Sequence, residues 1–521
     1  MKYPIGIQTF ENIIKDNYVY VDKTDMVYSL ANEGKIYFLS RPRRFGKSLL
    51  LSTLRAYFEG KKELFKGLKI ETLEKEWMLH KVFHFDFNGE NFTQPDTLSN
   101  CLDVYLTRWE MEFQIKPLEN ESFGARFAQI LKTAAEQTGR GAVVLVDEYD
   151  KPLLDVMEQN QEILEQNREI LKAFYSVFKQ ADAHLRFVFL TGVTKFSQVS
   201  VFSGFNQPKD ISMYDDYEAL CGITEEELHT LFAEPIRKMA DSEGYSEDEM
   251  KKRLKQHYDG YHFSKRMTDI YNPFSILNAF DAQDIRDYWF TSGTPSYLIR
   301  LMNHYHEGID QLANNYYSLD DFINYKADVE YPLPMIYQSG YLTIKDYDKR
   351  RNRFLLDFPN NEVKNGFLNM VASNYLNTKK DTSNTAQDLA FALEDGLPDE
   401  FRKILASFLA SIPYSMRRKE NERERERYFQ YTFYLLLRLM SVYTVLAERE
   451  QSEGRVDCIV ETPKYIYLFE FKLDGSAAEA LKQIENKGYA RPYEADARKL
   501  YKVGVNFSST TGTIEDWEIR E

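Results

Sequence analysis

The chain of 521 residues contains little cysteine and no long apolar run. Its three cysteines, Cys101, Cys221 and Cys458, are far apart, which excludes a disulfide framework or zinc cluster and predicts a reducing, cytoplasmic compartment. No stretch of about 18 uncharged apolar residues occurs, so we expect no membrane-spanning helix. The first residues have no basic region followed by an apolar run, so we expect no secretory signal.

Basic residues are also fewer than acidic ones, 66 against 81, which makes the formal net charge −15. A protein that coats nucleic acid through its overall charge would be basic, so contact with DNA must be confined to a local basic patch. The charge run at 417–427 offers such a patch, although charge runs more often form solvated helices or linkers. Its basic candidates are Arg417, Arg418, Lys419, Arg423 and Arg425.

Short apolar runs alternate with longer amphipathic stretches over residues 1 to about 215. The runs are KIYFLS (35–40), VFHFDF (82–87), AVVLVD (142–147) and RFVFLTG (186–192). This alternation predicts a parallel sheet that is covered by helices on both faces, and therefore an α/β fold. The sequence has no repeat period and no low-complexity tract.

The first apolar run leads directly into RPRRFGKS and then into a helical pattern. A strand, a turn with Gly-Lys-Ser and a helix form the geometry that binds phosphate groups. Gly46 lets the backbone approach the anion, Lys47 can reach the β- and γ-phosphates, and the Ser48 hydroxyl can bind Mg²⁺. Arg41 stands where this motif usually has its first glycine. The residues expected to bind nucleotide are Arg41, Pro42, Arg43, Arg44, Phe45, Gly46, Lys47, Ser48 and Leu49.

The apolar run at 142–147 ends in an acidic pair. We assign Asp147 as a Mg²⁺ ligand, because such acids stand at the carboxyl ends of buried parallel strands, and Glu148 as the group that polarises the attacking water. Thr191 ends another run and either contacts the γ-phosphate or the water, or is a cap or turn residue. Asp150 lies further into the turn and is not our first choice. These residues predict an ATPase site with ATP and Mg²⁺ as cofactors.

Several strings resemble the bacterial AAA-ATPase-like family of P-loop NTPases. PIGIQTFENIIKDNYVYVDKTDMVYSL, SRPRRFGKS, VLVDEYDKP and TGVTKFSQVSVFSGFNQPKDIS carry the resemblance over residues 3–215. It extends through YDGYHF (258–263) and WFTSGTPSYLI (289–299). In that family the RPRRFGKS form of the phosphate loop is usual. The resemblance suggests Asp22 and Lys23 for the rim of the site, although a surface ion pair is the plainer interpretation.

The chain after residue 225 has mostly helical periodicity up to about 415. Within it, PLPMIYQSGYLTIKDYD followed by FLLDFPN predicts a helix end and a small hairpin, which would suit a winged-helix element. The predicted regions are the ATPase domain (1–222), a helical lid (223–300), a helical and winged-helix-like middle region (301–415) and a nuclease-like domain (416–521). Candidates for an arginine finger are Arg237, Arg253 and Arg300. A homo-oligomer is possible on this basis.

The run TPKYIYLFEFKL near the C-terminus alternates cleanly at its end. Glu470 and Lys472 are two residues apart and therefore share one face of a strand, while GRVDCIVE places Asp457 on the preceding strand. Two carboxylates and a lysine can bind Mg²⁺ and activate a water, with Lys472 positioning the water or offsetting developing charge. An exposed salt bridge is the plainer interpretation of Glu-x-Lys alone.

The Asp457…Glu470-x-Lys472 pattern resembles the PD-(D/E)XK nuclease superfamily, and more closely the nuclease-type domain that commonly ends the AAA-ATPase-like proteins. The resemblance implies a restriction-endonuclease-like α/β fold, with Asp457 and Glu470 as metal ligands. Glu426, at the start of the upstream helix, matches the first-helix acid of many such nucleases. Nearby alternatives for that acid are Glu422 and Glu424. Candidates for phosphate or metal-water contact are Arg455, Gln483 and Lys487.

Two functional hypotheses follow. The leading one is an ATPase fused to a Mg²⁺-dependent nuclease, in which the nucleotide state controls cleavage of DNA. The alternative is a STAND-like ATPase signalling switch or scaffold that binds a partner protein, with the nuclease-like domain as a catalytically weak binding module. A membrane-remodelling ATPase is disfavoured, because the sequence offers neither a membrane segment nor a basic amphipathic helix.

Overall fold

The computed structural model describes two compact units of the chain. The first comprises the described residues up to Val363, and the second those from Lys364 to Glu521. The described residues are all of 1–521 except 117–120, 158, 196–207, 293–311, 324–330, 377–381, 413–428, 430–431, 434, 438, 440–443 and 452–453. The domain boundaries expected at 222, 300 and 415 stay predictions.

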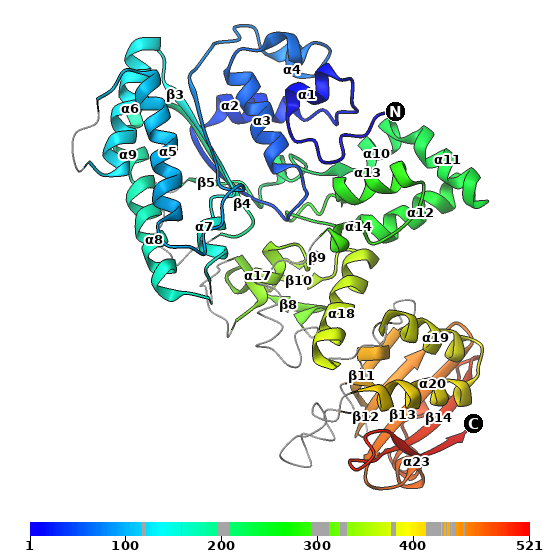
Figure 1. The fold of residues 1–521 in the computed structure, drawn as a ribbon. Helices are drawn as coiled ribbons and strands as arrows, with labels where there is room; N and C mark the ends of the chain where they lie inside the picture. The colour runs from blue at the N-terminus through cyan, green and yellow to red at the C-terminus, as the bar shows by residue number, and fades with distance from the viewer. Residues whose placement is uncertain are drawn as a thin grey trace. The chain divides into compact units, whose positions relative to one another are not determined.

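A five-stranded parallel sheet in the order β2-β3-β4-β1-β5 forms the centre of the first unit (Figure 1). Its strands are β1 (Ile36–Ser40), β2 (Val82–Asp86), β3 (Ala142–Asp147), β4 (Leu185–Gly192) and β5 (Lys209–Asp210). The apolar runs are the first four of these strands, as predicted. Every residue of β3 is buried, because it pairs on both edges and helices cover both faces of the sheet.

The helices of this sheet domain begin and end at residues that favour helix termini. Ser122 and Asn160 accept hydrogen bonds from the first turns of α6 and α8, and Gly139 ends α6 in the left-handed conformation. The helices are α1 (Phe10–Lys15), α2 (Thr24–Glu33), α3 (Lys47–Phe58), α4 (Ile70–Leu73), α5 (Thr97–Glu112), α6 (Phe123–Thr138), α7 (Lys151–Leu154), α8 (Gln161–Tyr175) and α9 (Val177–Gln180). Within the described parts of the chain, no helix is long and apolar enough to cross a membrane.

A group of helices follows the sheet and packs around its own apolar core. Its first helix begins with a capping box, in which Thr224 and Glu227 bond each other's backbone. The helices are α10 (Glu225–Leu231), α11 (Ala233–Glu243), α12 (Glu247–Tyr258), α13 (Pro273–Ala282) and α14 (Tyr288–Thr291). The short strands β6 (Ile223–Thr224) and β7 (Ile270–Tyr271) pair antiparallel beside them. This group lies in the range for which the sequence predicts a helical lid, and we call it the lid below; that role stays a prediction.

A three-stranded antiparallel sheet, in the order β8-β10-β9, completes the first unit. Its strands and helices are β8 (Asn315–Tyr317), α16 (Leu319–Ile323), α17 (Leu333–Gln338), β9 (Thr343–Asp348) and β10 (Arg353–Asp357). The predicted helix end and hairpin are therefore confirmed as α17 and the β9–β10 pair. Helix α18 (Asn361–Leu376) begins in this unit and continues in the second.

The second unit contains a mixed five-stranded sheet in the order β11-β12-β13-β14-β15. β13 and β14 are parallel, and α23 forms the crossover between them, whereas the other pairs are antiparallel. Leu481 and Ile484 of α23 pack against one face, and Phe401 of α20 contacts Phe469 on the other. The elements are α19 (Thr382–Glu394), α20 (Pro398–Ser411), β11 (Thr444–Gln451), β12 (Gly454–Glu461), β13 (Tyr465–Leu473), α23 (Ala477–Asn486), β14 (Lys499–Phe507) and β15 (Ile514–Arg520).

Candidate functional site

The phosphate loop connects the end of β1 at Ser40 to the start of α3 at Lys47. Gly46 occupies the N-cap position with φ +91°, a backbone conformation that L side chains rarely adopt. Its carbonyl accepts from the N–H of Leu50 and so starts the helical hydrogen bonds. The loop therefore aims the N-terminus of a twelve-residue helix at the space in front of it, which suits an anion.

Some side chains of the loop point into the protein and anchor it from behind. Arg41 is 1% exposed, and its guanidinium lies 4.1 Å from the centre of the Phe263 ring. Phe45 contacts Tyr261 and Phe263 edge-on, and Pro42, which follows Arg41, is also buried. The carbonyl oxygens that accept from Arg41 are those of Ser40, Ser212, Tyr217 and Glu218. The predicted nucleotide contacts of Arg41, Pro42 and Phe45 are thus replaced by a structural role for their side chains.

The remaining loop residues line a cavity of about 620 Å³, a volume ordinary for a small-molecule site. They are Arg43, Arg44, Gly46, Lys47, Ser48 and Leu49. Apolar lining residues come from two distant parts of the chain, the N-terminal segment and the lid. They include Pro4, Ile5, Ile7, Pro273, Phe274, Leu277 and Trp289. A lining with both charged and apolar side chains suits a ligand with phosphates and a flat base.

Lys47 lies between the loop and the acidic strand end. Its ammonium donates to the carbonyl oxygens of Arg41 at 3.0 Å and Pro42 at 3.2 Å. It also lies 3.5 Å from Oε1 of Glu148, and its side chain is 4% exposed. Lys47 and Glu148 both line the cavity, so the ammonium is available to an anion bound there.

The acids predicted for the ATPase site meet at the carboxyl end of β3. Asp147 is 1% exposed, and its Oδ1 accepts from the Thr191 hydroxyl at 2.7 Å. Thr191 is fully buried and orients Asp147, a contact that differs from the predicted one to phosphate or water. Glu148 lines the cavity and has φ +50°, an unusual conformation for a residue with a side chain. This turn aims Glu148 at the ligand space.

Asp150 supports this edge of the sheet, a role that the sequence analysis missed. Its Oδ2 accepts from the backbone N–H groups of Val193 and Thr194 at 3.0 and 2.6 Å, and from the Thr194 hydroxyl at 2.8 Å. Burial and the nearby charge of Glu148 raise the pKa of Asp150 to about 6. A Cβ at Gly192 would lie 2.5 Å from its Oδ1, so the close approach requires glycine. The last acid of DEYD was the signal available in the sequence.

Lys23 and Asp22 bind different partners and do not pair with each other. The Lys23 ammonium lies 2.6 Å from the carboxylate of Glu227 at the start of the lid, and its side chain is 9% exposed. The pair is therefore partly buried, where the sequence suggested a surface pair or a rim position. Asp22 accepts from the backbone N–H groups of Thr24 and Lys69.

The described arginine-finger candidates are engaged within the lid. Arg237 is exposed and pairs with Glu247 at 2.9 Å. Arg253 lies 3.9 Å from the centre of the Tyr245 ring. Arg300 lies outside the described residues. None of these contacts assigns a finger, and the role stays open for all three.

The second acidic site lies on the central strands of the C-terminal sheet. The antiparallel register pairs Cys458 with Phe469, which brings the next residues, Asp457 and Glu470, opposite each other on one face. Asp457 Oδ2 accepts from the backbone N–H of Phe471 at 2.8 Å. Glu470 is 1% exposed. The predicted carboxylates are thus brought together.

Gln483 of α23 joins the two charged residues of β13. Its amide nitrogen donates to Glu470 Oε1, and its amide oxygen accepts from the Lys472 ammonium at 2.8 Å. That ammonium lies 3.9 Å from Glu470 Oε1. Ser476 and Glu479 start α23 with a capping box, which sets the helix register that directs Gln483 at the strand. Two charged residues, Glu470 and Lys472, and the amide of Gln483 therefore form a bonded group beside Asp457.

Of the other predicted contacts of this site, the structure describes only the side chain of Lys487. Lys487 is exposed at the C-cap of α23. Arg455 lies on β12, where only its backbone is described. Glu426, its alternatives Glu422 and Glu424, and the basic run at 417–427 lie outside the described residues.

Both acidic sites offer hard oxygen ligands of the kind that Mg²⁺ prefers. Ser48 and Asp147 supply a hydroxyl and a carboxylate at the phosphate loop, and Asp457 and Glu470 supply two carboxylates on the sheet. Across the described residues, no group of three or more His, Cys, Asp or Glu could hold a metal. The donor sets fit Mg²⁺ only where phosphate oxygens and waters complete the shell, which is common for this ion.

Comparisons with known proteins agree with this architecture. The family described as Predicted AAA-ATPase matches residues 4–202, and the PD-(D/E)XK nuclease superfamily matches residues 424–517. The chain is 35% identical over 522 residues to "Uncharacterized protein in vnfD 5'region" of Azotobacter chroococcum mcd 1, and the alignment covers 98% of both proteins.

Two solved structures show a weaker likeness. The Aeropyrum pernix ORC1 protein in complex with DNA is 11% identical with a TM-score of 0.25, over 85% of this chain and 89% of that one. Cdc6p from Pyrobaculum aerophilum is 13% identical with a TM-score of 0.26, over 71% and 93%. Scores this low carry no argument, so the family rests on the sequence matches and the two sites. The chain belongs to the predicted AAA-ATPase family, with the ATPase domain fused to a PD-(D/E)XK nuclease superfamily domain.

Proposed function

We propose that this protein hydrolyses ATP at its phosphate loop and that the nucleotide state controls Mg²⁺-dependent cleavage of DNA at the C-terminal site. The observation that carries the cleavage half is the bonded group of Glu470, Lys472 and Gln483 beside Asp457. A surface salt bridge would not require a buried glutamate and an amide bridge from a helix.

At the phosphate loop, each residue has a defined task. Lys47 exchanges its carbonyl acceptors for the β- and γ-phosphates. Ser48 and Asp147 would hold Mg²⁺, which would neutralise phosphate charge when bound. Glu148 accepts a proton from the attacking water, because its carboxylate lines the cavity next to Lys47. Thr191 keeps Asp147 in position through its 2.7 Å hydrogen bond.

At the C-terminal site, Asp457 and Glu470 would hold the metal, which when bound would supply an activated water. Lys472 orients the attacking water or offsets the charge that develops on the phosphate. Gln483 keeps the ammonium of Lys472 and the carboxylate of Glu470 in register. We propose DNA as the substrate because the C-terminal domain belongs to a nuclease superfamily. RNA of the same sequence is the control substrate.

The test is a cleavage time course on plasmid DNA, linear DNA and RNA with Mg²⁺ or Mn²⁺, with and without ATP. We expect Lys472→Ala to slow cleavage about 100- to 1,000-fold, the range for removal of one electrostatic group, while ATP hydrolysis stays intact. Lys47→Ala should abolish ATP hydrolysis and remove the effect of ATP on cleavage. Lys464→Ala and Lys62→Ala, at exposed positions, serve as matched controls.

A second outcome would favour a different function. Intact ATP hydrolysis without metal-dependent cleavage under any condition would contradict the nuclease half. The protein would then be a nucleotide-controlled switch or scaffold, with the C-terminal domain docking a partner protein. Cleavage that Lys472→Ala does not change would contradict the assignment of the site.

A further inference from the structure

Helix α18 starts in the ATPase unit and runs on into the second unit. Its first turn contains Glu362, a carboxyl that is 1% exposed. Glu362 Oε1 accepts from the backbone N–H of Trp289 at 2.5 Å, and Oε2 accepts from the Ser275 hydroxyl at 2.7 Å. One side chain of α18 therefore holds two lid helices, α14 through Trp289 and α13 through Ser275.

These two lid helices also form part of the nucleotide cavity. Phe274 of α13 and Trp289 of α14 line it. The indole N–H of Trp289 donates to the carbonyl oxygen of Arg43 at 3.1 Å, and Arg43 belongs to the phosphate loop. The phosphate loop is thus connected to the first turn of α18 through one intermediate residue, Trp289.

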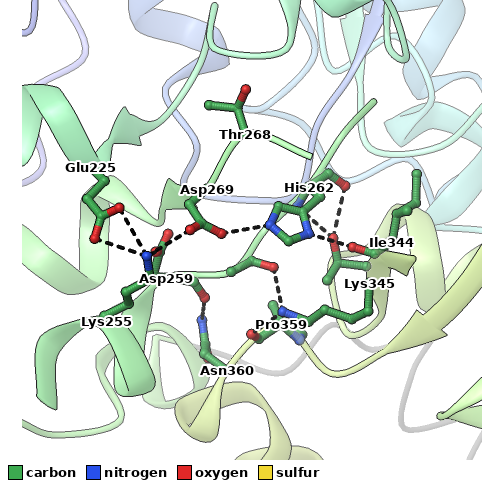
Figure 2. Close-up of polar contacts among 12 residues, drawn as sticks. Glu225, Lys255, Asp259, His262, Thr268, Asp269, Ile344, Lys345, Pro359 and Asn360 are labelled. Atoms are coloured by element: carbon green, nitrogen blue, oxygen red, sulfur yellow. Dashed lines mark hydrogen bonds and ion pairs between the residues drawn. The ribbon is translucent and has the colours of Figure 1, made fainter. Parts of the chain in front are cut away.

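A polar cluster provides a second attachment for the start of α18 (Figure 2). The ammonium of Lys345, on β9, donates to the carbonyl oxygens of Gly260 and Pro359, both at 2.8 Å. Asn360 donates through its amide to the carbonyl oxygen of Asp259 at 2.8 Å, and accepts from the backbone N–H of Val363 at 3.1 Å. The residues that open α18 are therefore bound to the segment 258–263.

The segment 258–263, YDGYHF, leads back to the phosphate loop. Tyr261 and Phe263 contact Phe45 edge-on, with ring centres 4.8 and 5.4 Å away. His262 is held by Asp269 at 2.8 Å and by the carbonyl oxygen of Ile344 at 2.6 Å (Figure 2). Both attachments of α18 thus end at the same loop, one through Trp289 and one through the aromatic rings.

We propose that Glu362 is a positioning residue of the nucleotide site. We further propose that a structural change at the phosphate loop on nucleotide binding reaches the first turn of α18, the helix that continues into the second unit. This inference rests on the proposed ATP control. A phosphate bound at the loop moves the carbonyl of Arg43 or fixes it in place. Trp289 and Glu362 then move with this carbonyl or are fixed with it, because breaking their buried hydrogen bonds would leave polar groups without partners.

The protonation of Glu362 offers a separate way to detect this role. Burial raises the pKa of its carboxyl to about 8. The titratable groups that face it are Asp287 and Tyr288 beside the lid helix, and Tyr258 and Tyr261 of the 258–263 segment. The carboxyl is therefore neutral in most molecules at pH 7, and glutamine is a close substitute for it.

The first experiment measures steady-state ATP hydrolysis by the full chain carrying Trp289→Phe, Glu362→Gln, Glu362→Ala or the Trp289→Phe/Glu362→Ala pair. Trp289→Phe and Glu362→Ala should each raise KM about fivefold, the effect of one hydrogen bond, with kcat changed less than twofold. The double variant should match the single ones. Glu362→Gln should keep the wild-type KM at pH 7. The control is Glu234→Gln, an exposed lid position.

The second experiment measures backbone amide hydrogen exchange in 361–368 with and without saturating ATP. Protection should change on ATP binding in the wild type, and the change should disappear in Trp289→Phe. Unchanged exchange in the wild type, or additive effects on KM, would overturn the inference while leaving ATP-dependent cleavage possible. A normal exchange response without DNA cleavage would instead contradict only the nuclease half of the proposed function. Absence of ATP binding would overturn both.

Discussion

The two candidate sites place a lysine beside a glutamate in different ways. Lys47 lies 3.5 Å from Glu148, and Lys472 lies 3.9 Å from Glu470. At the phosphate loop, the remaining partners of the lysine are backbone carbonyl oxygens. At the C-terminal site, the partner is the side chain of Gln483, which also binds the glutamate.

This difference shows how each site keeps its geometry. The phosphate loop is held by its backbone and by buried side chains behind it, so its cavity-facing residues are free to meet a ligand. The C-terminal site is held by bonds among the reactive side chains themselves. We therefore expect removal of a supporting residue to affect stability at the first site and activity at the second.

The largest effect should come from removing the anchor behind the phosphate loop. Arg41→Ala should lower the free energy of unfolding of the first unit by about 3–5 kcal/mol, because several buried carbonyl oxygens lose a charged donor. Arg43→Ala, an exposed position on the same loop, should change it by less than about 0.5 kcal/mol. Urea denaturation followed by tryptophan fluorescence measures both. Equal effects would remove the distinction between anchoring and cavity-facing residues.

Glu148→Gln should separate chemistry from binding at the first site. We expect ATP hydrolysis to fall about 100-fold, the lower range for loss of a general base, because the amide cannot accept the proton of the attacking water. ATP affinity, measured by calorimetry, should stay within about twofold. Glu162→Gln, at an exposed position in α8, should leave both quantities unchanged. Full hydrolysis by Glu148→Gln would show that another group takes the proton.

Gln483→Ala tests whether the second site depends on its amide bridge. Loss of the bridge should slow metal-dependent cleavage about tenfold, the cost of about one hydrogen bond to a charged group, with little change in stability. Asn486→Ala, at an exposed position of the same helix, is the control. A large loss of stability with normal cleavage per folded molecule would reverse the proposed contrast between the sites.

The smallest effect that we expect is a pH dependence of the free energy of unfolding, which comes from buried carboxyl groups of the first unit. Burial raises the pKa of Asp259 to about 7 and that of Glu362 to about 8. In the folded state these groups stay protonated at pH values where the unfolded chain has lost the proton. The stability that they contribute is therefore full below pH 4 and is lost as the pH rises toward 8.

Denaturation between pH 5 and 8 measures this loss. We expect the free energy of unfolding of the first unit to fall by about 1 kcal/mol per pH unit, below the limit of about 1.4 kcal/mol for each titrating group. Glu362→Gln should flatten the curve, whereas Glu400→Gln, at a half-exposed position of α20, should not. Stability that rises over this range in the wild type would contradict the role of these carboxyls.

Local patterns in the sequence determined much of the secondary structure and many of the site residues of this protein. The four apolar runs became β1 to β4, and Gly-Lys-Ser stands between a strand and a helix as expected. Asp457, Glu470 and Lys472 were identified by alternation along strands, which depends only on neighbouring residues. Gln483 was placed near the site by its position on the following helix, and the structure adds its two bonds.

Tertiary structure decided which way the same residues face and what they touch. Arg41 turns inward because its acceptor at Tyr217 lies 176 residues away, and Trp289 reaches the phosphate loop across 246 residues. Asp150 supports a strand end 44 residues further along the chain. Spacing along a sequence records backbone geometry over a few residues, whereas a buried polar group takes whatever partner the folded chain brings to it, and that partner decides its role.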